Sequence, residues 1–405
     1  MLVENISVPG DPRVWAEAIT LRDAGMLVSI ICPKSQQQRE SYVCLESIHI
    51  YRYTRPEGTG IKGYCVEYSF ALLMTLLVSF KVLLQRGFDV IHAANPPDFF
   101  FVIGLFYQLF GKKFVFDQHD PAPEMFLAKF KGQSKRSMFL QKLLRFLEYC
   151  SYRTSQIVIT SNLSQRQFAL ERGHAPAHKV FVVRNGPDLQ RMRLVTPELA
   201  LKMGKRYLLA YEGVMGEQDG VEYALYALDH LVHKRGRKDV SLILVGDGDR
   251  QRASRDLSCN LHLESYVNFV GWVAPEDVSH YLSAADVGLV PDPQNGMNEF
   301  CTIIKTMEYM ALGKPIVAFD LAETRVSAQG AALYAIPNRV EDFAEKIEIL
   351  LDDEETRRSM GMIGRRRIEE ELSWECSKGH LLAAYRTLFA VSPVPSLDKR
   401  RSVRW

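Results

Sequence analysis

The stretch Asn298–Asp320, NEFCTIIKTMEYMALGKPIVAFD, has the pattern of a helix start, an amphipathic helix, a turn and a buried strand. Apolar residues recur along it at helical spacing and form one face: Ile303, Ile304, Met307, Met310 and Ala311. Gly313 is a natural C-cap for this helix, and Pro315 cannot continue it. The short apolar run Ile316–Phe319 then predicts a parallel strand that is covered on both faces.

The polar residues of the same stretch suggest a ligand. Thr302, Lys305 and Glu308 are spaced by three, so we expect them to line one stripe of the helix. A helix start offers free N–H groups and a positive dipole end, which attract phosphate, and Lys305 adds a full charge. Glu308 suits a ribose diol because a carboxylate accepts two hydroxyl hydrogens. The pattern predicts a nucleotide site; the alternative is a surface helix with a Lys305–Glu308 ion pair.

Length and composition set the broad class of the protein. A chain of 405 residues is long enough for about two domains. A net charge of +2 gives no general case for nucleic-acid binding. The seven cysteines are odd in number and contain no C-x-x-C pair, which favours reduced cytosolic thiols over disulfides or a zinc site.

Two observations on targeting favour a cytoplasmic protein. The start, MLVENISVPG, has no basic region of the kind that opens a secretory signal. The longest apolar run, Tyr68–Phe80, is shorter than the ~20 residues that a spanning helix needs. We therefore expect no membrane-spanning helix.

The first half of the chain opens with a βαβ pattern. Met1–Val3 is predicted to be the tail of a first strand, Pro12 to begin a helix, and Met26–Cys32 to form the next strand. Arg13, at the start of the helix, either supplies charge to a diphosphate or is a solvated first-turn residue. Both interpretations remain open from the sequence.

His119 is the candidate site residue of the first half. A strand is predicted over Lys112–Phe116, and it runs into Asp117-Gln118-His119-Asp120. His119 therefore lies at the carboxyl end of a parallel strand, where open α/β sheets bind their ligands. The alternative is a histidine with a purely structural role.

The second half repeats the pattern with glycine-rich turns after its strands. The predicted strand Tyr207–Tyr211 leads into a turn with Gly213 and Gly216, and Val240–Val245 leads into a turn with Gly248. Such turns can direct backbone N–H groups toward a diphosphate, although glycine also occurs in turns for steric reasons alone. No G-x-G-x-x-G follows the first strand, which argues against a dehydrogenase.

These segments resemble the family-four glycosyltransferases, which have the GT-B fold. The stretch Glu308–Pro315, EYMALGKP, matches the family's glutamate, small-residue patch and Gly-x-Pro. Many members carry another glutamate eight positions earlier; Phe300 stands there, and the nearest carboxylate is Glu299. Where many members have a basic pair near the phosphates, this chain has Val214 and Asp219.

The resemblance implies an α/β fold of the GT-B type, with two facing Rossmann-like domains and the active site in the interdomain cleft. The expected divisions follow the chain: an acceptor-side domain over 1–188, a linker over 189–205, a nucleotide-sugar domain over 206–371, a C-terminal helix over 372–390 that packs back on the first domain, and a mobile tail over 391–405.

The resemblance also implies a function. It points to a retaining glycosyltransferase that moves a sugar from a nucleotide-diphospho-sugar to a glycan or lipid-linked acceptor, of the bacterial exopolysaccharide type. The catalytic candidates are His119, Lys305 and Glu299. The candidates for nucleotide binding are Gly213, Gly216, Gly248, Thr302, Lys305 and Glu308. No metal and no cofactor beyond the donor are expected. The alternatives are a nucleotide-sugar epimerase of the same fold and a GT-B binding protein without catalysis.

Met125–Leu147 is a basic segment with interleaved apolar residues and no acid. Its six basic residues are Lys129, Lys131, Lys135, Arg136, Lys142 and Arg145. A basic amphipathic segment can lie on an anionic membrane surface, which would make the protein peripheral on the inner membrane. The alternative is a helix that covers the sheet with a solvated basic face.

Overall fold

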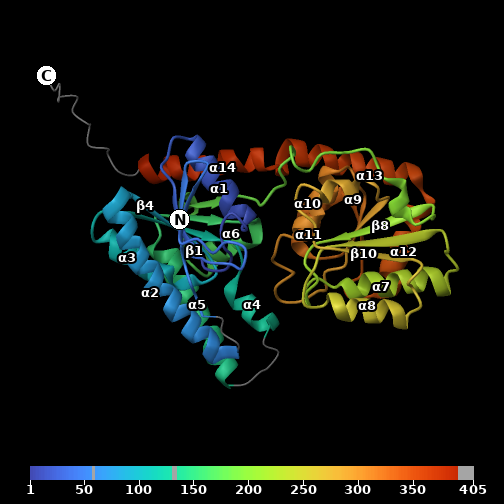
Figure 1. The fold of residues 1–405 in the computed structure, drawn as a ribbon, viewed down its shortest axis with the longest axis horizontal. Coiled ribbons are helices and arrows are strands. Elements are labelled where there is room, and N and C mark those ends of the chain that lie inside the picture. Colours follow the sequence, from blue (N-terminus) through green and yellow to red (C-terminus); the bar gives the residue numbers. More distant parts are fainter. Residues whose placement is uncertain (57–59, 130–134, 391–405) are drawn as a thin grey trace. The chain divides into compact units, whose positions relative to one another are not determined.

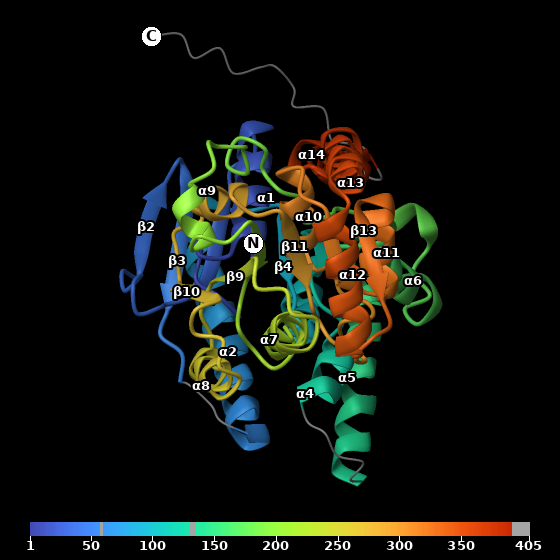
Figure 2. The ribbon, with the colours of Figure 1, turned by 90° about the vertical axis from the view of Figure 1, so that its right-hand side faces the viewer.

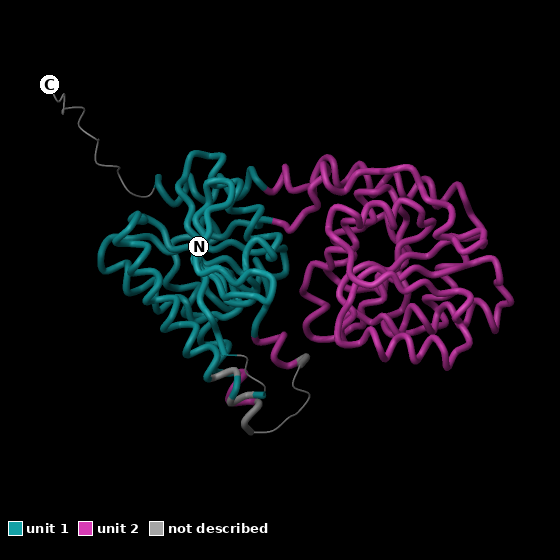
Figure 3. The backbone as a smooth tube through the Cα atoms, viewed as in Figure 1, with its two compact units in different colours: residues 1–122, 142–183, 378–405 teal, residues 123–141, 184–377 magenta. Residues whose placement is uncertain are grey.

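The computed structural model describes residues 1–56, 60–129 and 135–390 (Figure 1). The chain divides into two compact units (Figure 3). Unit 1 comprises residues 1–122, 142–183 and 378–405, and unit 2 comprises residues 123–141 and 184–377. The chain passes from the main part of unit 1 into the main part of unit 2 after residue 183. From the sequence, this division is expected after residue 188.

Unit 1 is built on a largely parallel sheet. Its strands are β1 (Ser29–Pro33), β2 (Tyr42–Leu45), β3 (Ile48–Tyr53), β4 (Val90–Ala94), β5 (Lys113–Gln118), β6 (Ile157–Thr160) and β7 (Val180–Val182). They form the runs β1-β3-β2 and β4-β5-β6-β7, and only β2 is antiparallel to its neighbour. Leu2 bridges Ile31 on one side and Ala93 on the other, so the predicted short first strand lies between β1 and β4.

Helices and short turns connect the strands of unit 1. They are α1 (Pro12–Asp23), α2 (Gly60–Arg86), η1 (Asp98–Phe100), α3 (Phe101–Gln108), α4 (Ala122–Lys129), α5 (Lys135–Thr154), α6 (Leu163–Glu171), η2 (Ala177–Lys179) and α14 (Trp374–Ala390). α1 begins where the sequence predicts, because the Asp11 carboxylate accepts hydrogen bonds from the N–H groups of Arg13 and Val14 and Pro12 fits the first helical position. α4 lies in unit 2 except for Ala122, whereas α5 and α14 each start in unit 2 and end in unit 1.

Unit 2 has a six-stranded sheet in which every neighbouring pair is parallel. Its order is β10-β9-β8-β11-β12-β13. The strands are β8 (Tyr207–Glu212), β9 (Val240–Val245), β10 (Val267–Gly271), β11 (Val287–Val290), β12 (Ile316–Phe319) and β13 (Ala332–Ala335). β9, β11 and β12 are buried throughout, as expected for parallel strands with helices on both faces.

The remaining elements of unit 2 complete the doubly wound arrangement. They are η3 (Leu199–Lys202), α7 (Val221–Asp229), η4 (His230–Lys234), α8 (Gln251–Asn260), α9 (Val278–Ser283), α10 (Ile304–Ala311), α11 (Ala322–Ala328), η5 (Gln329–Ala331), α12 (Val340–Asp352), α13 (Glu354–Arg367) and η6 (Ile368–Leu372). The core lies between the helices and the sheet and includes the buried ring of Tyr309 on α10. Gly288 on β11 makes this possible, because a Cβ there would lie 2.5 Å from that ring.

The deciding stretch of the sequence folds largely as predicted. Gly313 has φ of 62°, and the N–H groups of Gly313 and Lys314 donate to the carbonyls of Met310 and Tyr309, which is a Schellman C-cap. The predicted strand Ile316–Phe319 is β12. The apolar face is confirmed except at Ile304, which is 41% exposed.

The start of that helix differs from the prediction. α10 begins at Ile304, so Thr302 precedes the helix and does not share its stripe with Lys305 and Glu308. The Asn295 side-chain oxygen accepts from the N–H groups of Met297 and Asn298, and the preceding residues fold into turns.

Two expectations on membrane segments also change. α2 is 27 residues long, and its part Val66–Arg86 is long and apolar enough to cross a membrane, which the run Tyr68–Phe80 had not predicted. The charged residues Glu67 and Lys81 bound that run in the sequence, and the helix continues through both of them. In the basic segment, residues 130–134 and the side chains of Lys129, Lys135 and Arg136 lie outside the described part. The tail 391–405, predicted to be mobile, also lies outside it.

Candidate functional site

His92 and Asp117 belong to adjacent strands of unit 1 and point to the same face of the sheet. His92 on β4 pairs with Val115 on β5, and Asp117 lies two residues further along β5. Since side chains alternate along a strand, Asp117 faces the same side as Val115 and its partner. The two groups therefore meet, with 3.4 Å between His92 Nε2 and Asp117 Oδ2.

Helix α1 covers this pair with a cation and a second carboxylate. Arg13 and Glu17 are one helical turn apart and so lie on one face of α1, with 3.1 Å between the guanidinium and Glu17 Oε1. The Arg13 nitrogen near Glu17, Nη2, also donates to Asp117 Oδ1 at 2.9 Å, and Nη1 donates to the Val183 carbonyl at 2.8 Å. Arg13 is therefore a buried structural cation, unlike either interpretation open from the sequence.

His119 joins this cluster from the carboxyl end of β5. Its Nε2 lies 2.6 Å from Asp117 Oδ2, and its side chain is 15% exposed. The Asn95 side-chain oxygen accepts from the His119 N–H at 2.6 Å. Ser161 and Gln165 donate to the His119 carbonyl. Backbone and ring are thus both fixed, and the exposed edge of the imidazole is available to a ligand.

The charges of the cluster follow from burial and pairing. Burial works to raise the pKa of Asp117, but Arg13 and His119 outweigh it and hold that pKa well below its usual range. Burial also works to lower the pKa of His119, and the Asp117 carboxylate outweighs it, so the pKa of His119 is raised. Burial and the neighbouring Asp117 raise the pKa of Glu17. The cluster therefore holds one firm anion, Asp117, between two cationic groups.

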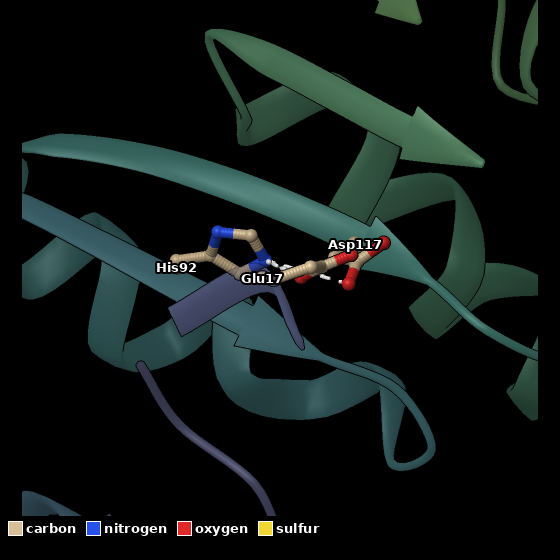
Figure 4. Close-up of side chains that lie close together, drawn as sticks. All are labelled: Glu17, His92 and Asp117. Carbon is tan, nitrogen blue, oxygen red and sulfur yellow. Dashed lines mark ion pairs between the residues drawn. The ribbon is translucent and has the colours of Figure 1, made fainter. Parts of the chain in front are cut away.

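Three side chains of this cluster are also spaced as the ligands of a metal ion could be. The ligand atoms of Glu17, His92 and Asp117 lie within 4.8 Å of one another, and all three side chains are buried (Figure 4). The Arg13 guanidinium already contacts both carboxylates, so an added cation would have to overcome its repulsion. The geometry fits an ion-pair network around His119 better than a metal centre.

Glycines in unit 2 let two turns pack backbone against backbone. Gly213 has φ of 129°, and a Cβ on Gly246 would lie 1.9 Å from the Gly213 carbonyl oxygen. Gly248 has φ of 157°, and its Cβ would lie 2.7 Å from the Met215 oxygen. The Gly216 N–H donates to Asp219 Oδ2 at 3.1 Å. At the predicted Gly213, Gly216 and Gly248, the structure therefore shows a steric or turn-closing role.

Lys305 lies in the first turn of α10 and is buried among acids. Its ammonium donates to both oxygens of Asp292, at 2.9 and 3.1 Å, and lies 3.8 Å from Asp219 Oδ1. Burial works to lower the pKa of Lys305, but Asp292 and Asp219 outweigh it and raise the pKa. Gly213 adjoins the same side chain, since a Cβ there would lie 3.2 Å from Lys305 Cε. A phosphate at Lys305 would therefore compete with Asp292.

Glu308 forms a carboxyl pair with Glu212 at the end of β8. Burial, followed by the charge of Glu308 and a hydrogen bond to it, raises the pKa of Glu212 well above its usual range. The raised pKa favours the protonated form of Glu212, which can donate a hydrogen bond to Glu308. Arg191 lies 3.9 Å from Glu308 Oε1, on the side open to solvent. The polar stripe of α10 is therefore a charged cluster at the carboxyl ends of parallel strands and not an exposed Lys305–Glu308 pair.

The last two predicted residues lie before α10. Thr302 is two residues from the helix start, and the N-cap residue of α10 is Ile303, whose side chain makes no capping hydrogen bond. Glu299 is directed elsewhere: its Oε1 accepts from the N–H of Ala322, at the start of α11, at 3.4 Å. Its Oε2 accepts from Gln294. The structure brings Lys305 and Glu308 together on α10, whereas these bonds hold Glu299 against α11.

One cavity of unit 1 is lined by none of the site residues predicted from the sequence, although His92 of the cluster borders it. It has a volume of about 620 Å³ and is lined by residues at the amino ends of strands, including Ser29, His49 and Val90. Ligands of open α/β sheets bind at the opposite, carboxyl ends. We therefore place the candidate site at Asp117–His119 and around α10, and not in this cavity.

Several residues of these clusters were missed from the sequence. They are Glu17, His92, Asp117, Arg191, Glu212 and Asp292. Three of them had a usable signal, because Asp117, Glu212 and Asp292 stand at or just after the ends of predicted strands. Arg191 fell in the predicted linker, and nothing in the local pattern indicates that it reaches Glu308.

Known proteins match both halves of the chain. Residues 13–191 match the family model described as Glycosyltransferase Family 4, and residues 206–353 match the model described as Glycosyl transferases group 1. A Corynebacterium glutamicum GDP-mannose-dependent monoacylated alpha-(1-6)-phosphatidylinositol monomannoside mannosyltransferase is 25% identical over 55% of this chain and 60% of its own length. Alignments with the first curated relatives span 39–61% of those proteins.

Solved structures share the fold over nearly the whole chain. Sucrose-phosphate synthase from Thermosynechococcus elongatus is 20% identical, with a TM-score of 0.76 and coverage of 96% of both chains. Anabaena HepE, solved with UDP, is 15% identical, with a TM-score of 0.70 and coverage of 96% of this chain and 99% of its own. Both likenesses agree with an α/β protein of two parallel-sheet domains. The chain belongs to the family-four glycosyltransferases, with the GT-B fold.

Proposed function

We propose that the protein is a retaining glycosyltransferase that uses a nucleotide-diphospho-sugar. The observation that carries the proposal is the charged cluster around α10, in which Lys305, Glu308 and Glu212 gather at the carboxyl ends of parallel strands in a chain of this family. Anabaena HepE has been solved with UDP and with UDP-glucose, which supports this class of donor. The mannosyltransferase relative is named as GDP-mannose-dependent, so the base is left open.

The carboxyl pair is suited to the ribose. A proton on Glu212 that is donated to Glu308 would leave Glu308 with acceptor positions for a diol and would hold its carboxylate in place from the end of β8. Arg191, at 3.9 Å, adds a positive charge on the solvent side of Glu308. Glu308 would thus bind the nucleotide whatever its base, and base selection would depend on other residues.

Negative charge develops on the diphosphate as the donor bond breaks, and the enzyme needs positively charged groups that stabilise it. Lys305 and the N–H groups at the start of α10, with Thr302 beside them, are the groups of unit 2 that could do so. Lys305 is held by Asp292 in the structure, so diphosphate binding would replace part of that ion pair. The acceptor hydroxyl then attacks on the face that the diphosphate leaves, and the diphosphate helps to take its proton.

His119 is assigned to the donor sugar. Its exposed edge can donate or accept a hydrogen bond at a sugar hydroxyl, while Asp117 Oδ2, at 2.6 Å, fixes the other side of the ring. Asp117 is therefore a positioning residue that acts through His119. Glu299, the third catalytic candidate, would need to leave the N–H of Ala322 to reach a substrate.

The acceptor is proposed to be a glycan or lipid-linked glycan, with the protein cytoplasmic and peripheral on the inner membrane. A curated relative acts on a phosphatidylinositol mannoside by its name, which supports an acceptor with a lipid part. Exposed basic residues of α5, Lys142 and Arg145, suit an anionic membrane surface.

Calorimetric titration with UDP, GDP and ADP tests the donor class, followed by assays with the sugar nucleotides of the base that binds. We expect one diphosphate to bind and its sugar nucleotide to release free diphosphate together with a sugar of unchanged anomeric configuration. An isomerised sugar without net transfer would identify an epimerase instead. Binding without any turnover would identify a binding protein, and no binding by any of the three would refute the nucleotide site.

A further inference from the structure

Helix α2 exposes a continuous apolar stripe along its outer side. Its residues follow one another at alternating intervals of four and three, which keeps them on one helical face, and all are exposed: Val66, Phe70, Leu73, Leu77, Phe80 and Leu84. We call these six residues the α2 stripe. Leu84 is 86% exposed. Figures 1 and 2 show α2, in blue, as a long helix whose start lies away from the strands of unit 1.

The other side of α2 is packed and partly polar. Ala71, Thr75, Ser79 and Val82 are buried, and α2 packs against β1 and β3. The Ser79 hydroxyl lies 2.8 Å from the Tyr107 hydroxyl, in hydrogen-bond contact with α3. Near its start, Glu67 pairs with Arg55 at 3.1 Å. A helix tied to the sheet in this way is placed to lie on a membrane surface and not to cross it.

The apolar surface continues from α2 onto α3. The ring of Phe80 contacts that of Phe106 at 5.5 Å between centroids, and Phe106 contacts Phe110 at 5.3 Å. The exposed apolar residues on α3 and directly after it are Val102, Leu105, Leu109 and Phe110. A contiguous apolar patch of this length is unusual on a free protein surface and marks an interaction site.

The charges around the patch favour one occupant. Among the described side chains of α2, α3 and α5, the exposed charged ones are all basic: Lys81, Arg86, Lys142, Arg145 and Arg153. The acids Glu67 and Glu148 of these helices are buried and paired with Arg55 and Arg172. Anionic lipid head groups complement these basic side chains around the apolar patch. A second copy of the chain would bring like charges together across a twofold interface.

We propose that unit 1 docks on an anionic lipid bilayer through the α2 stripe and the adjoining apolar face of α3. The inference deepens the membrane location given above, and it rests on that part of the proposed function. It moves the apolar contact from the segment Met125–Leu147 to α2, so that α2 lies in the plane of the interface with its inner side on the sheet. α5 then contributes basic charge through Lys142 and Arg145.

Co-sedimentation of the full chain with vesicles tests the proposal, using phosphatidylcholine with and without phosphatidylglycerol. We expect binding only where phosphatidylglycerol is present. Replacing Leu73, Leu77 and Leu84 together by glutamine should lower the partition coefficient at least about tenfold. A matched variant with glutamine at three other exposed leucines, Leu27, Leu163 and Leu199, should bind like the original chain. Lys81→Gln should lower binding about fivefold.

Three results would overturn the proposal. They are equal binding by the two leucine variants, no binding of the original chain to anionic vesicles, and a dimer in light scattering that the α2 variant dissociates without any vesicle binding. If the triple variant does not fold, Leu77→Trp replaces it. Its emission should shift to the blue on adding anionic vesicles, whereas that of Leu163→Trp should not. Nucleotide titration of the same samples is independent of vesicles, so a failed docking proposal and a failed donor proposal give different results.

Discussion

The two units each bury a cation between carboxylates, but solvent reaches the two clusters differently. In unit 1, Arg13 lies between Asp117 and Glu17, and neither carboxylate is exposed. In unit 2, Lys305 and Asp292 are each 6% exposed, while the neighbouring Asp219 is 26% exposed. The unit 1 cluster is closed except at His119, whereas the unit 2 cluster has an open rim.

The difference in solvent access suggests different roles: the unit 1 cluster orients a side chain of the protein, whereas the unit 2 cluster can bind a ligand. The closed cluster can stabilise one histidine in one orientation, because every charge in it is matched inside the protein. The open cluster has an arginine, Arg191, 34% exposed beside Glu308, and a lysine whose carboxylate partner a phosphate could replace. Four predictions test this contrast, beginning with the largest expected effect.

Removing the unit 1 cation should cost the most. Arg13→Met leaves Asp117 and Glu17 buried without their guanidinium, and breaking a buried pair in this way costs about 3–5 kcal/mol of unfolding free energy. Denaturant unfolding followed by tryptophan fluorescence, with Trp15 on α1 among the reporters, measures it. The control is Arg22→Met on the same helix, whose ion pairs are exposed and should contribute little to stability. Equal losses in the two variants would contradict the closed-cluster description.

The exposed edge of His119 should matter for turnover and not for nucleotide binding. His119→Ala is expected to lower kcat about a hundredfold to a thousandfold, the usual cost of losing one positioned polar group at the reacting centre. Affinity for the free nucleoside diphosphate should stay close to the original. Steady-state kinetics and calorimetry measure the two quantities, with the exposed His178→Ala of unit 1 as control. A parallel loss of affinity and turnover would indicate a structural role instead.

The open rim of unit 2 should bind the nucleotide through Glu308. Glu308→Gln removes a charged hydrogen-bond acceptor, and we expect nucleotide binding to weaken by about 1–3 kcal/mol. Calorimetric titration of the folded variant measures this directly. Glu345→Gln, at an exposed position on α12, is the control. Unchanged affinity in the Glu308 variant would remove this residue from the site.

Periodicity and turn chemistry were sufficient to predict much of the fold. The C-cap at Gly313 and the strand Ile316–Phe319 depend on neighbouring residues only, so the sequence shows them directly. α10 starts only at Ile304, after turns in which the Asn295 side chain accepts hydrogen bonds from Met297 and Asn298, and helix propensity alone does not predict such turns. The length of α2 was underestimated because Glu67 and Lys81 bound the apolar run Tyr68–Phe80 in the sequence, although the helix continues through both charged residues.

The sequence indicated where the candidate site residues lie in the fold, but it did not indicate which residues they pair with. Strand ends located His119, and helical spacing located Lys305 with Glu308. The pairing of Arg13 with Asp117 joins residues 104 positions apart, and that of Lys305 with Asp292 crosses a loop. Such contacts depend on how the strands are ordered in the sheet. A single sequence carries no direct signal of that order, and so the buried anions were missed.

The smallest expected effect is a pH dependence of folding stability that arises from Glu212, next to Glu308 in the unit 2 cluster. Burial and Glu308 raise the pKa of Glu212 above its unfolded value of about 4.3, so the folded protein binds more protons than the unfolded chain above that pH. Stability from this group is therefore fully present below about pH 4.3 and is lost as pH rises through the raised folded pKa. Glu212→Gln keeps a hydrogen-bond donor toward Glu308 but cannot titrate, so its stability relative to the original chain should increase with pH. Denaturant unfolding at about pH 5 and about pH 8 measures the difference. If the variant loses the same stability at both pH values, Glu212 is charged in the folded protein at both. Glu308 then receives no hydrogen bond from a protonated Glu212 that could hold its carboxylate in place for a ligand.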